Sequence, residues 1–389
     1  MLKISGSIKN FILFTIAILL SYLAHGQAHK PFSKMNLMAD FKVEYGFLLS
    51  HHLELDKFQS HFPAFELSIE KQTHGRQRWE SEYAYPIIGI SAWYSSLGGF
   101  SQLGSAIAVF PFINFPLTKN NKQSLNFRLG VGVGYLTNYY QRVDNYQNFA
   151  IGSHFNVAGR LFFEYRRQIS RLMHVNAGFG LTHFSNGSIK NPNYGLNMLT
   201  VTVSMSIYLN KPNPFFHKML LPELYPFEFD GKKKLDVDFS FSLARKNMSQ
   251  LYGQNFMVYA GYANLMKRIS YKSAFGIGLD LVYDGSDKYI LEWSGTPAEN
   301  TRQLLKPGAN VAYELIISQL SMMINFGFYL SGLERSEGDM YQRFSLRYRF
   351  AKNYFAQLAL GTNFGKAEYV GFGLGYRFDF IYKRKFKRA

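Results

Sequence analysis

The feature that most constrains this chain is an alternation of apolar with polar or small side chains, which recurs along most of its 389 residues. Every second residue from Met173 to Leu181 is apolar or small, and from Leu199 to Leu209 apolar residues alternate with threonine and serine. Successive side chains of a β-strand point to opposite sides, so each such segment predicts a strand with one apolar face. The chain is therefore predicted to be all-β.

The alternation divides the chain into two sets of eight expected strands. Those of the first half are Asp40–Ser50, Ala64–Thr73, Ile87–Ser96, Gly104–Leu117, Leu125–Thr137, His154–Arg166, Met173–Ser185 and Gly195–Leu209. Those of the second half are Leu235–Asn247, Phe256–Ser270, Ser273–Tyr283, Asn310–Leu320, Met322–Ser331, Arg343–Phe350, Tyr354–Asn363 and Tyr369–Phe380. Bacterial outer-membrane barrels have an even number of antiparallel strands, and both counts satisfy this requirement.

The composition agrees with an antiparallel transmembrane β-barrel rather than a helical membrane protein. Beyond the N-terminal segment there is no apolar run of 18 residues, the length that a spanning helix needs. Mean hydropathy is −0.13, because outward apolar and inward polar residues cancel in the average. Glycines 130, 132 and 134 share an inward face, which favours a narrow barrel filled by its own side chains. Arg160 and Glu164 are expected to form an ion pair inside it.

The order of segments predicts four parts. Residues 1–26 resemble a secretory signal, with Lys3 and Lys9 before an apolar run from Phe11 to Leu23, followed by the small-x-small cleavage sequence Ala24-His25-Gly26; the alternative is an uncleaved N-terminal anchor. Residues 27–210 form the first barrel, and the proline-rich residues 211–234 form a periplasmic linker. Residues 235–389 are the second set of strands. One large barrel made from both halves would favour a pore, whereas a small separate first barrel would favour an enzyme.

The formal net charge of +17 indicates an acidic partner. An exported barrel has little access to nucleic acid, so lipopolysaccharide is the expected partner and no nucleic acid is. The basic tail Lys383–Arg388 contributes to this charge and is expected to be a solvated end. The chain has no cysteine, and its histidines show no ligand spacing, so neither a metal nor another cofactor is predicted.

The candidate catalytic residues are His183, Ser185 and Asn197. His183 and Ser185 continue the apolar face of one expected strand, and Asn197 lies on the apolar face of the next. Directly opposed side chains of neighbouring antiparallel strands have Cβ atoms about 4.5–5.5 Å apart, so Asn197 is expected to reach the His183 ring. A base, a nucleophile and an orienting group would then share one row. The competing interpretation is a polar rim at the end of a strand.

The same stretch resembles the PagL family of outer-membrane lipid A 3-O-deacylases. The family pattern of His, one residue, Ser and Asn, followed by a Pro-Asn-x-Gly turn, is present as His183, Ser185, Asn186 and residues 192–195. This resemblance extends no further than about Leu209. It implies that Asn186 and Asn193 stabilise the oxyanion. The family has a Glu where this chain has Asn197, so the negative charge that would stabilise a protonated histidine is missing.

Together these observations predict a serine esterase that removes an ester-linked acyl chain from lipid A in the outer membrane of a Gram-negative bacterium. Odd-numbered strands are expected to run outward, which places His183 and Ser185 at the extracellular rim facing lipid. The alternative is a non-catalytic barrel, either a channel or a structural protein, in which the triad has decayed at Asn197.

Overall fold

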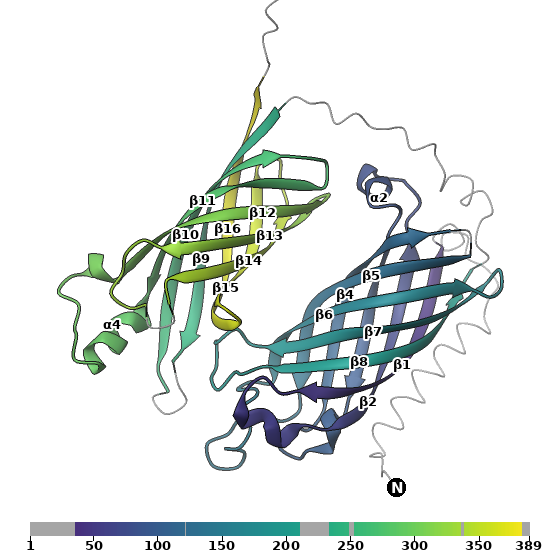
Figure 1. Cartoon of the computed structure of the whole chain (residues 1–389), viewed down its shortest axis with the longest axis horizontal. Coiled ribbons are helices and arrows are strands. Elements are labelled where there is room, and N and C mark those ends of the chain that lie inside the picture. The colour runs from purple at the N-terminus through teal and green to yellow at the C-terminus, as the bar shows by residue number, and fades with distance from the viewer. Residues whose placement is uncertain (1–35, 121, 211–232, 249–252, 336–337, 383–389) are drawn as a thin grey trace, which may run out of the picture.

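The computed structural model describes residues 36–120, 122–210, 233–248, 253–335 and 338–382 (Figure 1). Within these ranges the chain forms two closed antiparallel barrels of eight strands each. The all-β prediction is confirmed, and the halves form two small barrels rather than one large barrel. The expected signal segment, most of the linker and the basic tail lie outside the described residues. No helix in the described part of the chain is long and apolar enough to span a membrane.

The first barrel closes where its first strand pairs with its last. Its strands are β1 (Leu37–Leu49), β2 (His61–Gln72), β3 (Ile87–Ser95), β4 (Ala106–Lys119), β5 (Gln123–Leu136), β6 (Phe155–Gln168), β7 (Met173–Ser185) and β8 (Leu196–Tyr208). The loops carry two 3-10 helices, η2 (Leu53–Phe58) and η3 (Leu97–Gly99), and the short helix α2 (Arg78–Glu82). β1 pairs with β8 from Met38↔Tyr208 to Leu49↔Asn197.

The second barrel closes in the same way, between its first strand and its last. Its strands are β9 (Lys233–Asn247), β10 (Asn255–Arg268), β11 (Ser273–Asp284), β12 (Leu305–Ile317), β13 (Leu320–Tyr329), β14 (Met340–Arg349), β15 (Tyr354–Asn363) and β16 (Lys366–Tyr382). Helix α4 (Gly285–Trp293) and the 3-10 helix η4 (Thr301–Leu304) lie in the long connection between β11 and β12. All sixteen expected strands are present.

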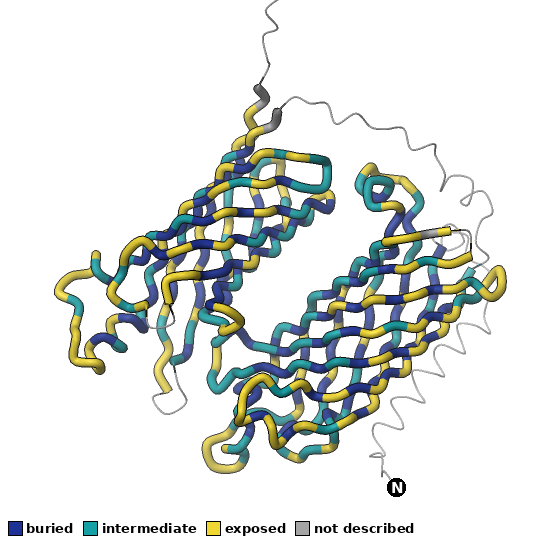
Figure 2. Tube along the Cα trace, in the orientation of Figure 1, coloured by how far each residue is buried: buried dark blue, intermediate teal, exposed yellow. Residues whose placement is uncertain are grey.

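Buried and exposed residues alternate along the strands of both barrels (Figure 2). The outward positions of the first barrel carry large apolar side chains that are exposed, such as Phe41, Tyr45, Val201 and Val203. Removing apolar surface from water is favourable, so a continuous apolar wall of this kind requires a lipid environment. The predicted distribution, apolar outward and polar inward, is confirmed.

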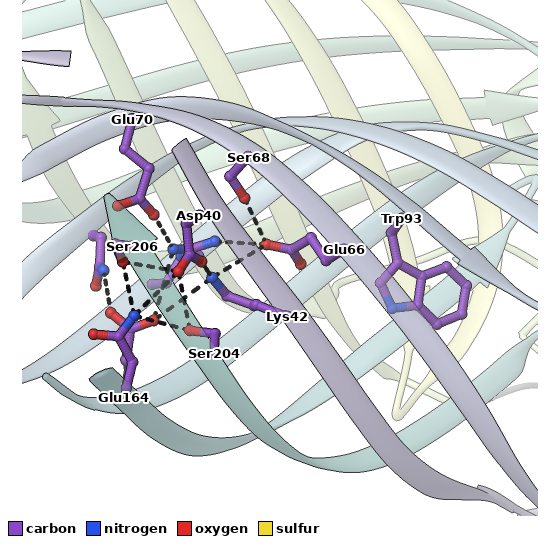
Figure 3. Close-up of polar contacts among 12 residues, drawn as sticks. Asp40, Lys42, Glu66, Ser68, Glu70, Trp93, Glu164, Ser204 and Ser206 are labelled. Atoms are coloured by element: carbon purple, nitrogen blue, oxygen red, sulfur yellow. Dashed lines mark hydrogen bonds and ion pairs between the residues drawn. The ribbon is translucent and has the colours of Figure 1, made fainter. Parts of the chain in front are cut away.

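The interior of the first barrel carries a network of ion pairs between buried side chains (Figure 3). Arg128 binds Glu66 at 2.7 Å and Glu70 at 2.6 Å, and all three side chains are buried. Buried charges are tolerated only when they are paired and hydrogen-bonded, which explains why this network contains both signs. The other members are Asp40, Lys42, Glu44, Arg160, Glu164 and Arg166.

The expected ion pair between Arg160 and Glu164 is corrected by this network. Arg160 binds Glu44 at 2.5 Å and Glu66 at 3.1 Å, whereas Glu164 binds Arg166 at 3.2 Å. Both residues lie inside the barrel as predicted. The partners of Arg160 lie on β1 and β2, across the lumen, and the spacing along β6 does not reveal them. Arg166, which binds Glu164, lies on β6 itself, two residues further along the strand.

Toward the ends of the odd-numbered strands, the side chains inside the first barrel are mostly apolar. We call this end of the barrel, where β7 ends and β8 begins, the site end. Phe184 is fully buried there, with its ring centroid 5.8 Å from that of Trp93. Because Phe184 points inward, its neighbours in β7, His183 and Ser185, must point outward. The buried aromatic pair thus fixes which side of the wall carries the candidate site.

The interior of the second barrel also carries ion pairs and aromatic side chains. Arg377 binds Asp238 at 2.6 Å and Glu314 at 2.9 Å within the lumen. Toward the opposite end, Tyr262 and Tyr369 share a hydrogen bond of 3.2 Å, and the Arg343 guanidinium lies 3.7 Å from the centre of the Tyr262 ring. Eight-stranded barrels leave just enough room for such side chains, and the described interiors of both barrels follow this rule.

The two barrels lie side by side (Figure 1), and side chains connect them at both ends. We call the end opposite the site end the linker end, since β8 finishes and β9 begins there. At the linker end, Tyr83 Oη donates to Ile316 O over 2.8 Å, and the Arg78 guanidinium lies 3.1 Å from the centre of the Tyr271 ring. At the site end, Ser188 Oγ donates to Ala367 O over 2.6 Å.

Candidate active site

The hairpin β7–β8 brings His183 and Asn197 directly opposite each other on the outward face. His183 Nδ1 donates to Asn197 Oδ1 over 2.6 Å, so the expected contact between the two side chains is present. Both residues are half-buried. The acceptor at Nδ1 favours the tautomer whose Nε2 lone pair is free to accept a proton.

Ser185 lies two residues beyond His183 in β7 and therefore on the same face. Its hydroxyl oxygen accepts from Asn193 Nδ2 over 2.9 Å and from the backbone nitrogen of Gly187 over 3.2 Å. Among the described residues, no hydrogen bond joins Ser185 to His183. Hydrogen bonds between a nucleophile and its base are often long before the substrate binds. The observation that bears on catalysis is therefore that the side chains of Ser185 and His183 lie next to each other on one face of β7.

The two asparagines implied by the resemblance occupy different positions relative to Ser185. Asn193 donates to the hydroxyl with its amide nitrogen, and its Oδ1 accepts from the backbone nitrogen of Asn186 over 2.9 Å. Asn186 is buried, and its own amide nitrogen donates to Ser153 Oγ over 3.0 Å and to Lys190 O over 2.8 Å. The Asn193 side chain therefore faces Ser185, whereas the Asn186 side chain holds the loop.

Gly195 leaves room for the His183 ring. Its φ of +82° is one that other residues rarely adopt, and a Cβ at this position would lie 2.9 Å from His183 Cε1. The backbone here is held from the β5–β6 loop, since Gly195 N donates to Ala150 O over 2.9 Å. The glycine of the turn thus allows the backbone to pass directly beside the imidazole.

One residue of the site was missed by the sequence analysis. Asn197 Nδ2 donates to His51 Nδ1 over 3.1 Å, and His51 Nε2 lies 2.8 Å from Tyr194 O. The pairing of Leu49 with Asn197 brings His51, two residues beyond β1, to this place. A signal was available, because closing an eight-stranded barrel places the end of the first strand beside the start of the last.

The imidazole of the neighbouring His52 stacks on the Tyr194 ring. Its ring centroid lies 4.4 Å from that of Tyr194 in a stacked arrangement. Burial lowers the pKa of His52 below its usual value, and the adjacent His51 lowers this pKa further. Burial also raises the pKa of Tyr194, with Glu54 adding to the effect. Both rings are thus favoured in their neutral forms.

The second barrel contacts the loop that carries Asn193. The side-chain nitrogen of Asn191 donates to the backbone oxygens of Asn247 and Met248 at the end of β9. A Cβ at Gly187 would lie 2.0 Å from Val370 Cγ2, so the loop backbone rests directly on β16. The loop is therefore held on two sides, by the β5–β6 loop of its own barrel and by the second barrel.

In the part of the chain that the structure describes, no group of three or more His, Cys, Asp or Glu side chains is placed to hold a metal ion. The groups that surround Ser185 are amides, an imidazole and backbone nitrogens. Their arrangement suits proton transfer and stabilisation of an oxyanion.

Comparisons with known proteins agree with this description. Residues 64–206 match the family model described as lipid A 3-O-deacylase (PagL), and residues 235–380 match the model described as acyloxyacyl hydrolase, C-terminal domain. None of the curated proteins compared with the chain matches it. Each family match falls on one of the two barrels.

Solved structures of outer-membrane barrels are similar to the chain at low identity. One, described as the outer membrane enzyme PagL, is 15% identical with a TM-score of 0.30, covering 42% of this chain and 97% of its own. Another, the Acinetobacter baumannii outer membrane protein Omp33, is 9% identical with a TM-score of 0.18, covering 88% of this chain and 98% of its own. The chain is an outer-membrane β-barrel protein of a Gram-negative bacterium whose first half matches the PagL family of lipid A 3-O-deacylases and whose second half, beyond the expected limit of the resemblance near Leu209, matches the C-terminal domain of acyloxyacyl hydrolases.

Proposed function

We propose that this protein is a serine esterase that removes an ester-linked acyl chain from lipid A. The observation that carries the proposal is the hydrogen bond of 2.6 Å between His183 and Asn197 on the row that also holds Ser185. This bond fixes the histidine in the tautomer that a general base needs. The PagL match over residues 64–206 supports lipid A as the substrate.

In the proposed reaction His183 Nε2 takes the hydroxyl proton of Ser185 while the oxygen attacks the ester carbonyl. The tetrahedral intermediate carries its negative charge on the former carbonyl oxygen. Collapse of this intermediate breaks the bond to the sugar oxygen, which receives the proton from His183. Water, deprotonated by His183, then attacks the acyl-serine and releases a fatty acid, and Ser185 regains its proton.

Asn193 is the side chain best placed to stabilise the oxyanion, because its Nδ2 already lies 2.9 Å from Ser185 Oγ. The backbone nitrogen of Gly187 lies 3.2 Å from the same oxygen and is the second donor. Preformed donors of this kind contribute about 10²–10³ in rate each in other enzymes. We assign Asn186 to support of the loop, since Ser153 and Lys190 take its amide hydrogens.

The outward position of the row suits a substrate that stays in the membrane. His183 and Ser185 are on the side of β7 that carries the exposed apolar side chains Val175 and Phe179. An acyl chain can therefore reach Ser185 from the lipid without passing through the filled lumen. We propose that the site end is extracellular, level with the leaflet that contains lipid A.

The rival function is a barrel without catalytic activity. Asn197 in place of the family's Glu favours this rival, because an amide supplies no charge to a protonated His183. A channel is the less favoured form of it, since the described interiors of both barrels are filled by side chains.

Mass spectrometry of lipid A decides between the two functions. We expect cells that express the protein to lose an ester-linked acyl chain, and cells that express Ser185→Ala or His183→Ala to retain it. Each variant should keep the heat-modifiable mobility of a folded barrel, because both side chains point away from the lumen. Deacylation by either folded variant at the parent rate would rule out the proposed mechanism.

A further inference from the structure

The hydrogen bonds around Asn197 form a chain whose direction is set at one end. Tyr194 O is a backbone carbonyl and can only accept, so His51 Nε2, at 2.8 Å, must carry the hydrogen. A neutral imidazole has one N–H, and His51 Nδ1 is then an acceptor. Asn197 must turn its NH₂ group toward that nitrogen, at 3.1 Å, and its oxygen toward His183, at 2.6 Å.

This direction matters because an amide has two different ends of nearly the same shape. Rotation of the Asn197 amide by 180° would present its NH₂ group to His183 Nδ1. The imidazole would then carry its hydrogen on Nε2, and that nitrogen would no longer accept a proton from Ser185. A serine protease whose triad carboxylate becomes an amide loses about 10⁴ in kcat through this wrong tautomer.

A carboxylate at the same position has no such problem, since both of its oxygens accept. An asparagine at position 197 therefore needs a neighbouring group to orient its amide, whereas a carboxylate there would not. His51 is placed to meet this requirement, because β1 pairs with β8 and brings it beside Asn197 from the opposite side to His183.

On the basis of the proposed function, we propose that His51 is a positioning residue that holds the Asn197 amide in the orientation required for His183 to act as a base. His51 does not contact the substrate. His51 donates to the Tyr194 carbonyl and accepts from the Asn197 amide nitrogen, and this leaves the Asn197 oxygen to accept from His183. The structural alternative is that His51 only attaches the β1–β2 loop to Tyr194.

Three substitutions of His51 separate these roles through kcat and KM for lipid A, measured with the full-length protein in detergent micelles. His51→Ala removes a hydrogen bond worth about 1 kcal/mol, and we expect kcat to fall about fivefold with KM unchanged. His51→Gln can accept from Asn197 and donate to Tyr194, so it should recover most of the loss. His51→Lys can only donate, which turns the Asn197 oxygen away from His183, so kcat should fall below that of His51→Ala.

The decisive comparison repeats His51→Ala in an Asn197→Asp background, which keeps the size of the side chain and removes its two different ends. We expect the substitution to have less than a twofold effect there. An equal loss in both backgrounds, or His51→Lys as active as His51→Gln, would overturn the inference in favour of the structural role. The order of the three variants in the parent decides the matter if the Asn197→Asp background has no activity.

Two controls distinguish a failure of the proposed role of His51 from a failure of the proposed esterase function. His61→Ala removes another exposed histidine near the site end, one that stacks on Tyr45 rather than bonding to Asn197, and it should leave kcat unchanged. Ser185→Ala should be inactive. Full activity of Ser185→Ala would overturn the proposed function itself, whereas an inactive Ser185→Ala together with His51→Ala at the parent rate overturns only the role of His51.

Discussion

The assignment of the oxyanion donor rests on the contrast between Asn193 and Asn186, and substitution of each asparagine tests it. Asn193→Asp keeps the oxygen that accepts from the Asn186 backbone nitrogen at 2.9 Å, so the loop should hold its shape. It replaces the donor that lies 2.9 Å from Ser185 Oγ with a second acceptor. Loss of one oxyanion donor costs about 10²–10³ in kcat, or about 2.7–4 kcal/mol in the transition state.

The assay is the release of fatty acid from purified lipid A by the full-length protein, with kcat and KM determined separately. For Asn193→Asp we expect kcat to fall at least about 10²-fold with little change in KM, since the donor acts on a charge that only the transition state carries. Thermal unfolding should be within about 1 kcal/mol of the parent, because the hydrogen bond to Asn186 remains.

Asn186→Ala is the matched control from the same loop. It removes the hydrogen bonds to Ser153 and Lys190 and leaves their oxygens without these donors, so stability should fall by about 1–3 kcal/mol. Its kcat should fall less than that of Asn193→Asp. If Asn193→Asp retains kcat within threefold of the parent, or if Asn186→Ala is the more damaging to kcat, the assignment of Asn193 as the donor is refuted.

Four further predictions follow from the structure. Asn197→Glu should raise the deacylation rate or leave it unchanged, because it restores a charge beside His183, whereas Asn197→Leu should lower it; equal activity of the leucine variant would show that Asn197 orients nothing. Gly195→Ala should lower kcat at least tenfold in the same assay, since the added Cβ would lie 2.9 Å from His183 Cε1. Single cysteines introduced into residues 186–194 should react with a membrane-impermeant label on intact cells, and protection of that loop would reverse the orientation. Burial raises the pKa of Asp287 in α4 to about 7, above its usual value. The protonated carboxyl group therefore contributes to stability at low pH, and this contribution is lost as the pH rises toward 7. Thermal unfolding at pH 5 and pH 8 should show this loss in the parent but not in Asp287→Asn.

The strands could be predicted from sequence because each has its own period-2 pattern and needs no knowledge of its neighbours. The expected bounds of β7, Met173–Ser185, coincide with the observed ones. Helix α4 was missed, although Asp284 marks its start as an N-cap that accepts from Ser286 N. The helix lies in a connection between strands, where no repeated pattern of apolar residues indicates the secondary structure.

The candidate site could be predicted only in part. His183 and Asn197 lie on adjacent strands of one hairpin, so alternation and register were enough to bring them together. His51 and the partners of Arg160 depend on which strands meet when the barrel closes and on which side chains cross the lumen. The different roles of Asn186 and Asn193 depend on the path of the loop backbone, which a motif does not determine.

The contacts of the β7–β8 loop with the second barrel have a consequence for biosynthesis. Ser188 and Asn191 take hydrogen-bond partners from Ala367 and Asn247, residues that the ribosome adds long after the loop itself. The loop therefore acquires its final set of partners only after the second barrel has closed and docked. A chain truncated within the second half would carry every residue of the candidate triad and still lack these contacts of the loop with the second barrel.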